Sequence, residues 1–166
     1  MRRICQTKDV NRSGLAALSL LCAALCVPPV ARAQTESLSY GAEWRFLRSG
    51  EVGLTFSPGQ NRLTLKTVGL VSTLIPVDDI YTSAYGDGFC STSLSLESRE
   101  GRKQRETKVD YDRSAKRVSY VERDVKTGRT IAYKQMEIPS CVHEVTSALL
   151  KLRKLKPEPG ATIELP

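Results

Sequence analysis

Few side chains in this sequence are of the types that carry chemistry, and the first to consider surround its one histidine. His143 lies two residues after Cys141 and directly before Glu144, and thiolate, imidazole and carboxylate groups are ligands that zinc takes. The three belong to a segment that we predict to be helical, where residues this close in sequence point in different directions. A lone histidine also leaves a nucleophilic triad without visible partners. We therefore predict no metal, no cofactor and no catalytic residue.

A second group of reactive side chains is a set of carboxylates in the middle of the chain, at Asp110, Asp112, Glu122 and Asp124. A pair of such groups can hydrolyse a glycosidic bond, because one donates a proton while the other attacks or activates water. These four lie near expected turns and among arginines, which favours solvated charge pairs across a β-hairpin. A carbohydrate-acting hydrolase is kept as an alternative function.

The first 33 residues have the three parts of a secretory signal peptide. Arg2 and Arg3 supply the positive start, residues 15–30 form a short apolar run, and residues 31–33 form an Ala-x-Ala cleavage site. We predict cleavage after Ala33 and a mature protein that is periplasmic or secreted. The apolar run is too short for a membrane span, so we predict a protein that is not membrane-spanning.

Cleavage would change both the charge and the cysteine content of the protein. The whole chain carries +7, but residues 34–166 keep 20 basic and 17 acidic residues, a net charge of about +3. A net charge this small does not indicate a nucleic-acid partner, so we predict none. Cys90 and Cys141 are the two cysteines that remain. Because disulfides persist in exported compartments, we predict a Cys90–Cys141 bond, which would contribute roughly 4 kcal/mol in the chain-entropy model. Two buried free thiols are the alternative.

From residue 38 to residue 137 the sequence has the pattern of strands and turns. Apolar and polar residues alternate with period two, beginning at residues 40–46. Turn-forming pairs such as Ser49-Gly50 and Pro58-Gly59 separate the runs. Residues 68–77 are mostly apolar and fit either a buried strand or a short connection. We expect about eight strands, with one face of the sheet in water.

Residues 138–159 carry the strongest helix signal. Ser140 can cap the start, and Pro157 ends the pattern. Apolar residues recur at spacings of three and four, at Val142, Val145, Leu149, Leu152 and Leu155. This stripe predicts a core helix packed on the sheet. The alternative is a helix on a membrane surface, which the basic last turn favours.

These patterns predict a mainly β (α+β) fold. It would be a curved antiparallel β-sheet, or open half-barrel, packed on one long C-terminal helix. No repeat or linker interrupts the pattern, so residues 34–166 are expected to form a single β-rich domain.

Several stretches of the mature chain match a known pattern in order. They are YGAEWRFLRSGE at 40–51, VDDIY at 77–81, GFC at 88–90, VERD at 121–124, CVHEVTSA at 141–148, and Leu152-Arg153 through PGATIELP at 159–166. In these the sequence resembles the Domain of Unknown Function 3108 family of exported bacterial proteins. The resemblance implies an exported, β-rich protein without an established activity, whose relatives usually continue with further strands. Because this chain stops at Pro166, we expect a truncated reading of a longer gene, with C-terminal strands missing. The expected layout is also similar to that of lipoprotein carriers of the LolA type.

The leading hypothesis is a non-enzymatic envelope protein that binds an apolar or amphipathic ligand, such as a lipid, in the concave face of the sheet. It depends on apolar residues expected on that face, namely Trp44, Phe46, Leu54, Phe56 and Tyr81. The second hypothesis is a structural or protein-interaction module of the cell envelope. Such a module would use a sheet edge or the basic hairpin within residues 99–108.

Overall fold

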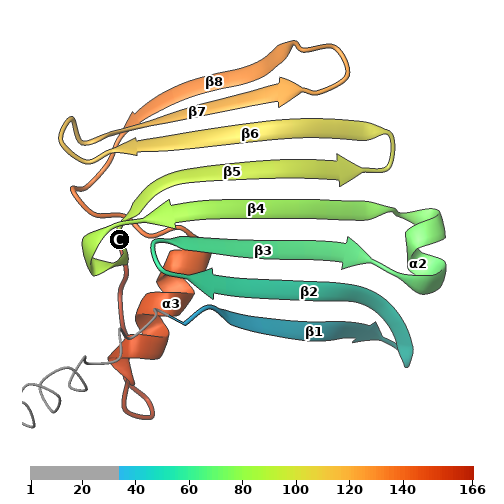
Figure 1. Ribbon diagram of the computed structural model, residues 1–166, viewed down its shortest axis with the longest axis horizontal. Helices are drawn as coiled ribbons and strands as arrows, with labels where there is room; N and C mark the ends of the chain where they lie inside the picture. Colours follow the sequence, from blue (N-terminus) through green and yellow to red (C-terminus); the bar gives the residue numbers. More distant parts are fainter. Residues whose placement is uncertain (1–33) are drawn as a thin grey trace, which may run out of the picture. The chain divides into compact units, whose positions relative to one another are not determined.

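A computed structural model describes residues 34–166, and the predicted signal peptide lies outside the described residues. The described residues form one open antiparallel sheet in which each strand pairs with the next along the chain (Figure 1). The sheet confirms the predicted mainly β fold. Its eight strands are β1 (Glu36–Trp44), β2 (Leu47–Ser57), β3 (Gln60–Thr67), β4 (Val77–Tyr85), β5 (Ser91–Glu100), β6 (Lys103–Asp112), β7 (Arg117–Asp124) and β8 (Thr130–Glu137).

Within residues 34–166, three short helical elements accompany the sheet. They are α2 (Gly69–Leu74), the 3-10 turn η1 (Asp87–Phe89) and α3 (Val145–Leu155). α2 occupies the apolar segment that the sequence left open, which is therefore a connection between β3 and β4 rather than a strand. α3 lies at one end of the sheet and α2 at the other (Figure 1). In the described range, no helix combines the length and the apolar character needed to cross a membrane.

The register of the strands gives the sheet one apolar and one polar face. Leu54, Leu63, Tyr81 and Leu96 are successive register partners across β2 to β5. Directly opposed residues of neighbouring strands point to the same face, so these four form one apolar row. The adjacent row on the other face consists of Thr55, Arg62, Thr82, Ser95 and Lys108.

The first hairpin reverses at Arg45 and Phe46, which corrects the turn predicted at Ser49-Gly50. Both residues have positive φ angles, of 49° and 68°. Ser49 and Gly50 lie inside β2 instead. The reason is register: Leu38 is opposite Leu54, which aligns the apolar faces of β1 and β2 and places the reversal near residue 46.

The C-terminal helix is shorter than predicted and begins at Val145 rather than after Ser140. Its N-cap is Glu144, whose carboxylate accepts hydrogen bonds from the backbone N–H groups of Thr146 (2.8 Å) and Ser147 (2.6 Å). A carboxylate at this position satisfies two amides that have no partner within the helix, and its charge suits the helix dipole.

Tertiary contacts keep the residues before α3 out of the helix. Cys141 forms a disulfide with Cys90, and the carbonyl oxygen of Val142 accepts a hydrogen bond from the backbone N–H of Ser91 (2.9 Å). Both contacts attach the segment to the start of β5. A helical path through Ser140 would break them, so the long helix that local spacing predicts does not form.

The first turn of α3 contacts the sheet through polar side chains, which corrects the prediction of an apolar core stripe. Thr146 and Ser147 are 2% and 0% exposed. The Thr146 hydroxyl lies 2.8 Å from the Ser83 hydroxyl of β4, and the Ser147 hydroxyl lies 3.1 Å from the Ser91 hydroxyl of β5. Buried hydroxyls need such partners, so these pairs set how the helix is rotated about its own axis.

As a consequence, apolar side chains of α3 remain exposed. Val145 is 68% exposed and Leu149 is 41% exposed. The described residues bury few apolar side chains in all, namely Phe56, Cys90, Val109 and Val118. Asn61 is also buried, and its amide atoms have no hydrogen-bond partner within residues 34–166. The core therefore depends on a small number of side chains.

Candidate functional site

The candidate site is an apolar cavity of about 210 Å³ between the sheet and the first turn of α3. We call it the apolar corner, and define it by Leu63, Leu65, Tyr81, Leu94 and Val145. Glu144 and Thr146 complete its lining.

Strand alternation and helix rotation together build the apolar corner. Leu63 and Leu65 are two residues apart in β3, so they share the apolar face, and Tyr81 is the register partner of Leu63. Val145 forms the helical wall because Thr146 is held against the sheet. Leu149 lies four residues after Val145 and therefore continues the same side of α3. The result is an apolar floor and an apolar wall that meet at an angle.

Tyr81 brings one polar group to the apolar corner. Burial, and to a lesser extent the negative charge of Asp79, raises the pKa of Tyr81 above its ordinary range. The phenol is therefore protonated at any physiological pH and can donate a hydrogen bond. Tyr81, Glu144 and Thr146 are the polar side chains of the lining, and a cavity that is otherwise apolar suits a ligand whose surface is mostly hydrocarbon.

The five apolar residues predicted to face a ligand do not all come together. Tyr81 lines the apolar corner, and Leu54 continues its apolar row on β2. Phe56 is buried, at 6% exposed. Trp44 and Phe46 lie at the first hairpin instead, with Phe46 fully exposed. Period two assigned Trp44 and Phe46 to the same strand, but the reversal at residue 46 removes them from the site.

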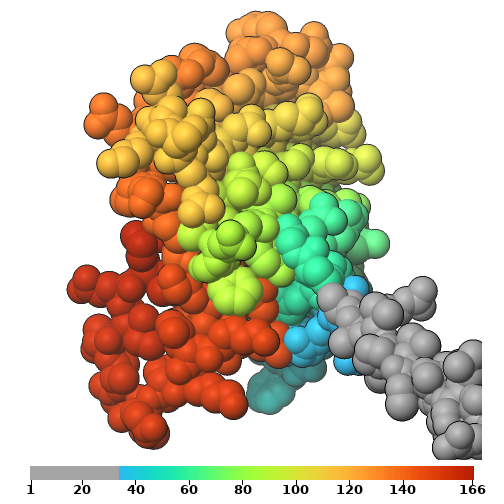
Figure 2. Space-filling model, turned by 60° about the vertical axis from the view of Figure 1, so that its left-hand side comes forward, coloured from blue at the N-terminus to red at the C-terminus, as the bar shows by residue number. Residues whose placement is uncertain are grey.

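The disulfide attaches the start of α3 to the sheet. The Sγ atoms of Cys90 and Cys141 are 2.01 Å apart, and 51 positions separate the two residues. Figure 2 shows the C-terminal segment, in red, packed against the yellow-green segment that contains η1. The predicted pairing is therefore present, and it holds the helical wall of the apolar corner against the end of β4 and the start of β5.

His143 lies beside the disulfide. Its Nε2 atom is 3.8 Å from the Cys141 Sγ and 3.1 Å from the Lys151 Nζ. The Sγ atoms of Cys90 and Cys141 and a ring nitrogen of His143 lie within 4.8 Å of one another, and atoms of these types can bind a metal. The sulfurs are bonded to each other, however, and a disulfide offers no thiolate to a metal. Glu144, the third residue considered from the sequence, caps α3 instead.

The four carboxylates considered for hydrolysis lie on different faces of the sheet. Asp110 is opposite Ser119, whereas Glu122 is opposite Thr107, so alternation sends the two acids to opposite faces. Glu122 instead accepts a charged hydrogen bond from Arg105 across the β6–β7 pair, at 2.7 Å. This is the kind of cross-hairpin pair that the sequence predicted.

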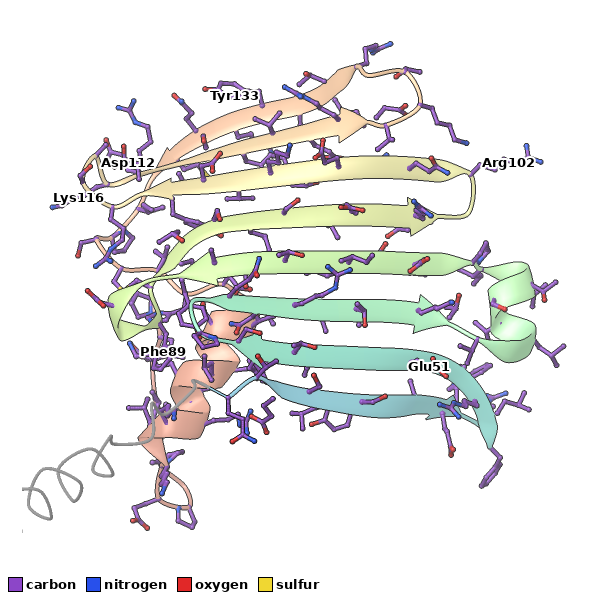
Figure 3. The ribbon with its side chains drawn as sticks, in the orientation of Figure 1. Glu51, Phe89, Arg102, Asp112, Lys116 and Tyr133 are labelled. Atoms are coloured by element: carbon purple, nitrogen blue, oxygen red, sulfur yellow. A yellow bond between two sulfur atoms is a disulfide. The ribbon has the colours of Figure 1, made fainter. Side chains whose placement is uncertain are left out.

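Asp112 and Asp124 each stabilise a turn. Asp112 accepts hydrogen bonds from the Ser114 hydroxyl (2.6 Å) and the Ala115 backbone N–H (2.9 Å). Asp124 accepts from the Thr127 backbone N–H (2.8 Å) and hydroxyl (3.0 Å). These bonds favour the ionised form and lower the pKa of both carboxyls below its ordinary range. Figure 3 shows Asp112 near the turn after β6.

The two turn aspartates predict a pH dependence of stability. A carboxyl whose pKa is lower in the folded state contributes stability above its unfolded pKa, near 4, and loses it as the pH falls through the folded pKa. We expect the free energy of unfolding to fall below about pH 4. The variant Asp112→Asn/Asp124→Asn should show a shallower fall in urea titrations at several pH values. Asp110→Asn, which removes a charge outside the turns, should keep the wild-type slope; equal slopes in all three proteins would contradict this assignment.

One family profile matches the chain over residues 39–166, and that family is described as "Protein of unknown function (DUF3108)". The matched range includes most of β1 and all later elements, so it contains both disulfide cysteines and the whole apolar corner. No curated protein and no solved structure matches the chain. The chain belongs to the DUF3108 family.

Proposed function

We propose that this protein is an exported, non-enzymatic binding protein that holds the hydrocarbon chain of an amphipathic small molecule in the apolar corner. The observation that carries the proposal is the orientation of α3. Polar side chains of its first turn contact the sheet, while Val145, at 68% exposed, forms the wall of a cavity whose floor is mostly aliphatic. Exposed apolar side chains are unfavourable in water, so an arrangement that gathers them around a cavity favours a bound apolar chain.

The shape of the apolar corner favours an acyl chain over a protein surface. The cavity measures about 210 Å³ and is bounded on two sides, by β3 to β5 and by α3. A space of this volume accepts a single flexible chain. Fatty acids and lipid acyl chains have the required hydrocarbon surface, and each buried methylene group contributes about 0.8 kcal/mol to binding.

Binding of a fluorescent fatty acid to residues 34–166 tests the proposal. We expect saturable binding at one site, and Val145→Glu should weaken it by roughly tenfold or more, because a charge would replace apolar surface at the wall. Val145 is exposed and lies at the first position of α3, where a negative charge is tolerated, so the variant should fold.

Val125→Glu is the matched control, because Val125 is 56% exposed and lies outside the apolar corner. It should bind the probe as the wild-type protein does. Equal loss in both variants, or no saturable binding in the wild type, would contradict the proposed site. A dimer that forms only when the probe is absent would instead identify a second copy as the occupant.

Export is the second part of the proposal. It is supported by the signal-peptide pattern of residues 1–33 and by a disulfide, which persists in oxidising compartments. Intact mass spectrometry of the protein recovered from the cell envelope should give a chain that begins at Gln34 and gains the mass of two hydrogen atoms on reduction. Recovery of the uncleaved chain with free thiols from the cytoplasm would contradict this part alone.

A protein-interaction module of the envelope is a second candidate, favoured by the outer edge of the sheet. Among the described strands, β8 pairs only with β7, and Figure 3 shows Tyr133 on this edge strand. Tyr133 and Met136 of β8 are 61% and 57% exposed. An unpaired edge can accept a strand from a partner. Crosslinking from Tyr133 to an envelope protein, lost on Gln135→Pro in β8, would favour this candidate over lipid binding.

A further inference from the structure

We propose a second binding site, which takes a small aromatic anion in a cleft at the far end of α3. The cleft has a volume of about 520 Å³, within the range of small-molecule sites. We call it the basic cleft. The side chains that define it are Phe56, Tyr85, Phe89, Arg153, Lys154 and Lys156. The apolar corner uses the first turn of α3, whereas the basic cleft uses its last turn, so the two sites are distinct.

Aromatic rings form one part of the basic cleft. Tyr85 and Phe89 have ring centroids 5.6 Å apart, with their planes tilted by 47°. Phe56 lies beneath the helix and also borders the cleft. Three rings from β2, β4 and η1 thus meet at one place. Aromatic rings favour offset or tilted packing on one another, so a ligand ring can pack in this way against Tyr85 and Phe89.

The backbone at Phe89 is held in a conformation that aromatic residues seldom adopt. Phe89 has a φ of +62°, and Gly88 before it has a φ of +68°. The Phe89 backbone N–H donates to the Gly86 carbonyl, and Cys90 directly afterwards is fixed by the disulfide. Left-handed conformations of bulky residues cluster at functional sites, where the surrounding structure holds them. Here the conformation presents the Phe89 ring beside α3 (Figure 3).

Cations form the other part of the basic cleft. The Arg153 guanidinium lies 5.2 Å above the centre of the Phe56 ring and 2.9 Å from a Glu36 carboxylate oxygen. Within residues 34–166, neither Lys154 nor Lys156 forms an ion pair. The helix dipole accounts for cations at this end of α3, but it does not account for the aromatic rings below them. The combination selects a ligand with both a negative charge and a ring.

Glu36 is the natural competitor for such a ligand. Glu36 lies on β1, and its carboxylate accepts a hydrogen bond from the Arg153 guanidinium. This hydrogen bond lowers the pKa of Glu36. A ligand carboxylate or phosphate would accept the same hydrogen bond from Arg153. The geometry therefore predicts that removal of the Glu36 charge strengthens anion binding, a result opposite to that expected if Glu36 only stabilised the fold.

Phenyl phosphate is the test probe, with inorganic phosphate and phenol as its two halves. In NMR titrations of residues 34–166, we expect phenyl phosphate to shift the signals of Phe56, Tyr85 and Phe89 and to bind roughly tenfold more tightly than either half. Lys154→Gln/Lys156→Gln should weaken binding by roughly tenfold, and Glu36→Gln should strengthen it severalfold.

Two further variants make the test specific. Arg102→Gln/Lys103→Gln also removes two positive charges, but from the β5–β6 hairpin, where Figure 3 shows Arg102. This variant should leave binding unchanged. Phe89→Gly should fold, because glycine accepts the positive φ, and should bind phenyl phosphate no better than inorganic phosphate. Equal affinity of phosphate and phenyl phosphate in the wild type, or equal loss in the hairpin variant, would overturn the proposal. Val145→Glu should not change binding here, so this test does not depend on the apolar corner.

Discussion

Replacement of Cys90 and Cys141 by alanine is expected to lower the free energy of unfolding by about 4 kcal/mol. The bond closes a loop of 51 positions, and the chain-entropy model assigns this value to a loop of that length. The effect should be large relative to the whole, because single domains are commonly stable by only 5–15 kcal/mol. Urea unfolding of the wild-type and double-alanine proteins would measure it.

Reduction of the wild-type protein is the control for the disulfide prediction. The reduced wild type and the double-alanine variant should have the same midpoint, since both lack the bond and differ only in two small side chains. A difference below about 1 kcal/mol between oxidised and reduced wild type would contradict the prediction, since removal of a native disulfide from a small exported domain typically costs 2–5 kcal/mol. In the reduced protein, amide exchange should also show α3 as the first element to open, because the bond attaches the N-terminal side of α3 to the sheet.

Phe56→Ala is expected to lower the free energy of unfolding by about 3–5 kcal/mol. Phe56 is 6% exposed and is the largest of the few buried apolar side chains in the described range. Its removal would leave a cavity beneath α3 and would also remove the ring below Arg153. Thermal unfolding by circular dichroism would show the loss as a lower midpoint.

Trp44→Ala is the matched control for Phe56→Ala. Trp44 is the larger side chain, but it is 62% exposed on β1, near the first hairpin. We expect a change within about 1 kcal/mol, as for other exposed positions, with a further small part from the Arg45 guanidinium 4.9 Å from the Trp44 ring. If Trp44→Ala were the more damaging variant, burial would not be the quantity that determines stability here.

α3 is the element on which both proposed sites depend. Its first turn forms the wall of the apolar corner, and its last turn supplies the cations of the basic cleft. The disulfide and the hydroxyl pairs at Thr146 and Ser147 hold the helix in the orientation that both sites require. α3 therefore borders two cavities, one at its first turn and one at its last turn, and does not cover a core.

Local patterns in the sequence correctly predicted the strands of the sheet, because alternation of period two is a property of neighbouring residues. The same is true of turns such as Pro58-Gly59, where the residue types themselves favour reversal. The Cys90–Cys141 pairing could also be predicted, since only two cysteines follow the proposed cleavage site. The family could be predicted because several short stretches of the chain match the pattern of that family in the same order.

The first hairpin shows where local patterns fail. Ser49-Gly50 has the stronger turn composition, but the pairing of Leu38 with Leu54 aligns the apolar faces of two strands and moves the reversal to residues 45 and 46. Register is decided by contacts between strands, and no single strand contains that information. The same reason explains why Trp44 and Phe46, which share the alternation of β1, do not belong to the candidate site.

By itself, then, the sequence determined that this chain forms an antiparallel sheet with a C-terminal helix, and which two cysteines are joined. Only the tertiary structure decided where that helix begins and which of its sides meets the sheet. The spacing of apolar residues predicted that Val145 and Leu149 pack on the sheet. Instead, Thr146 and Ser147 contact it, because their hydroxyls pair with those of Ser83 and Ser91. Buried polar groups must find partners, and those partners lie more than fifty residues away in the chain, where local periodicity cannot indicate them.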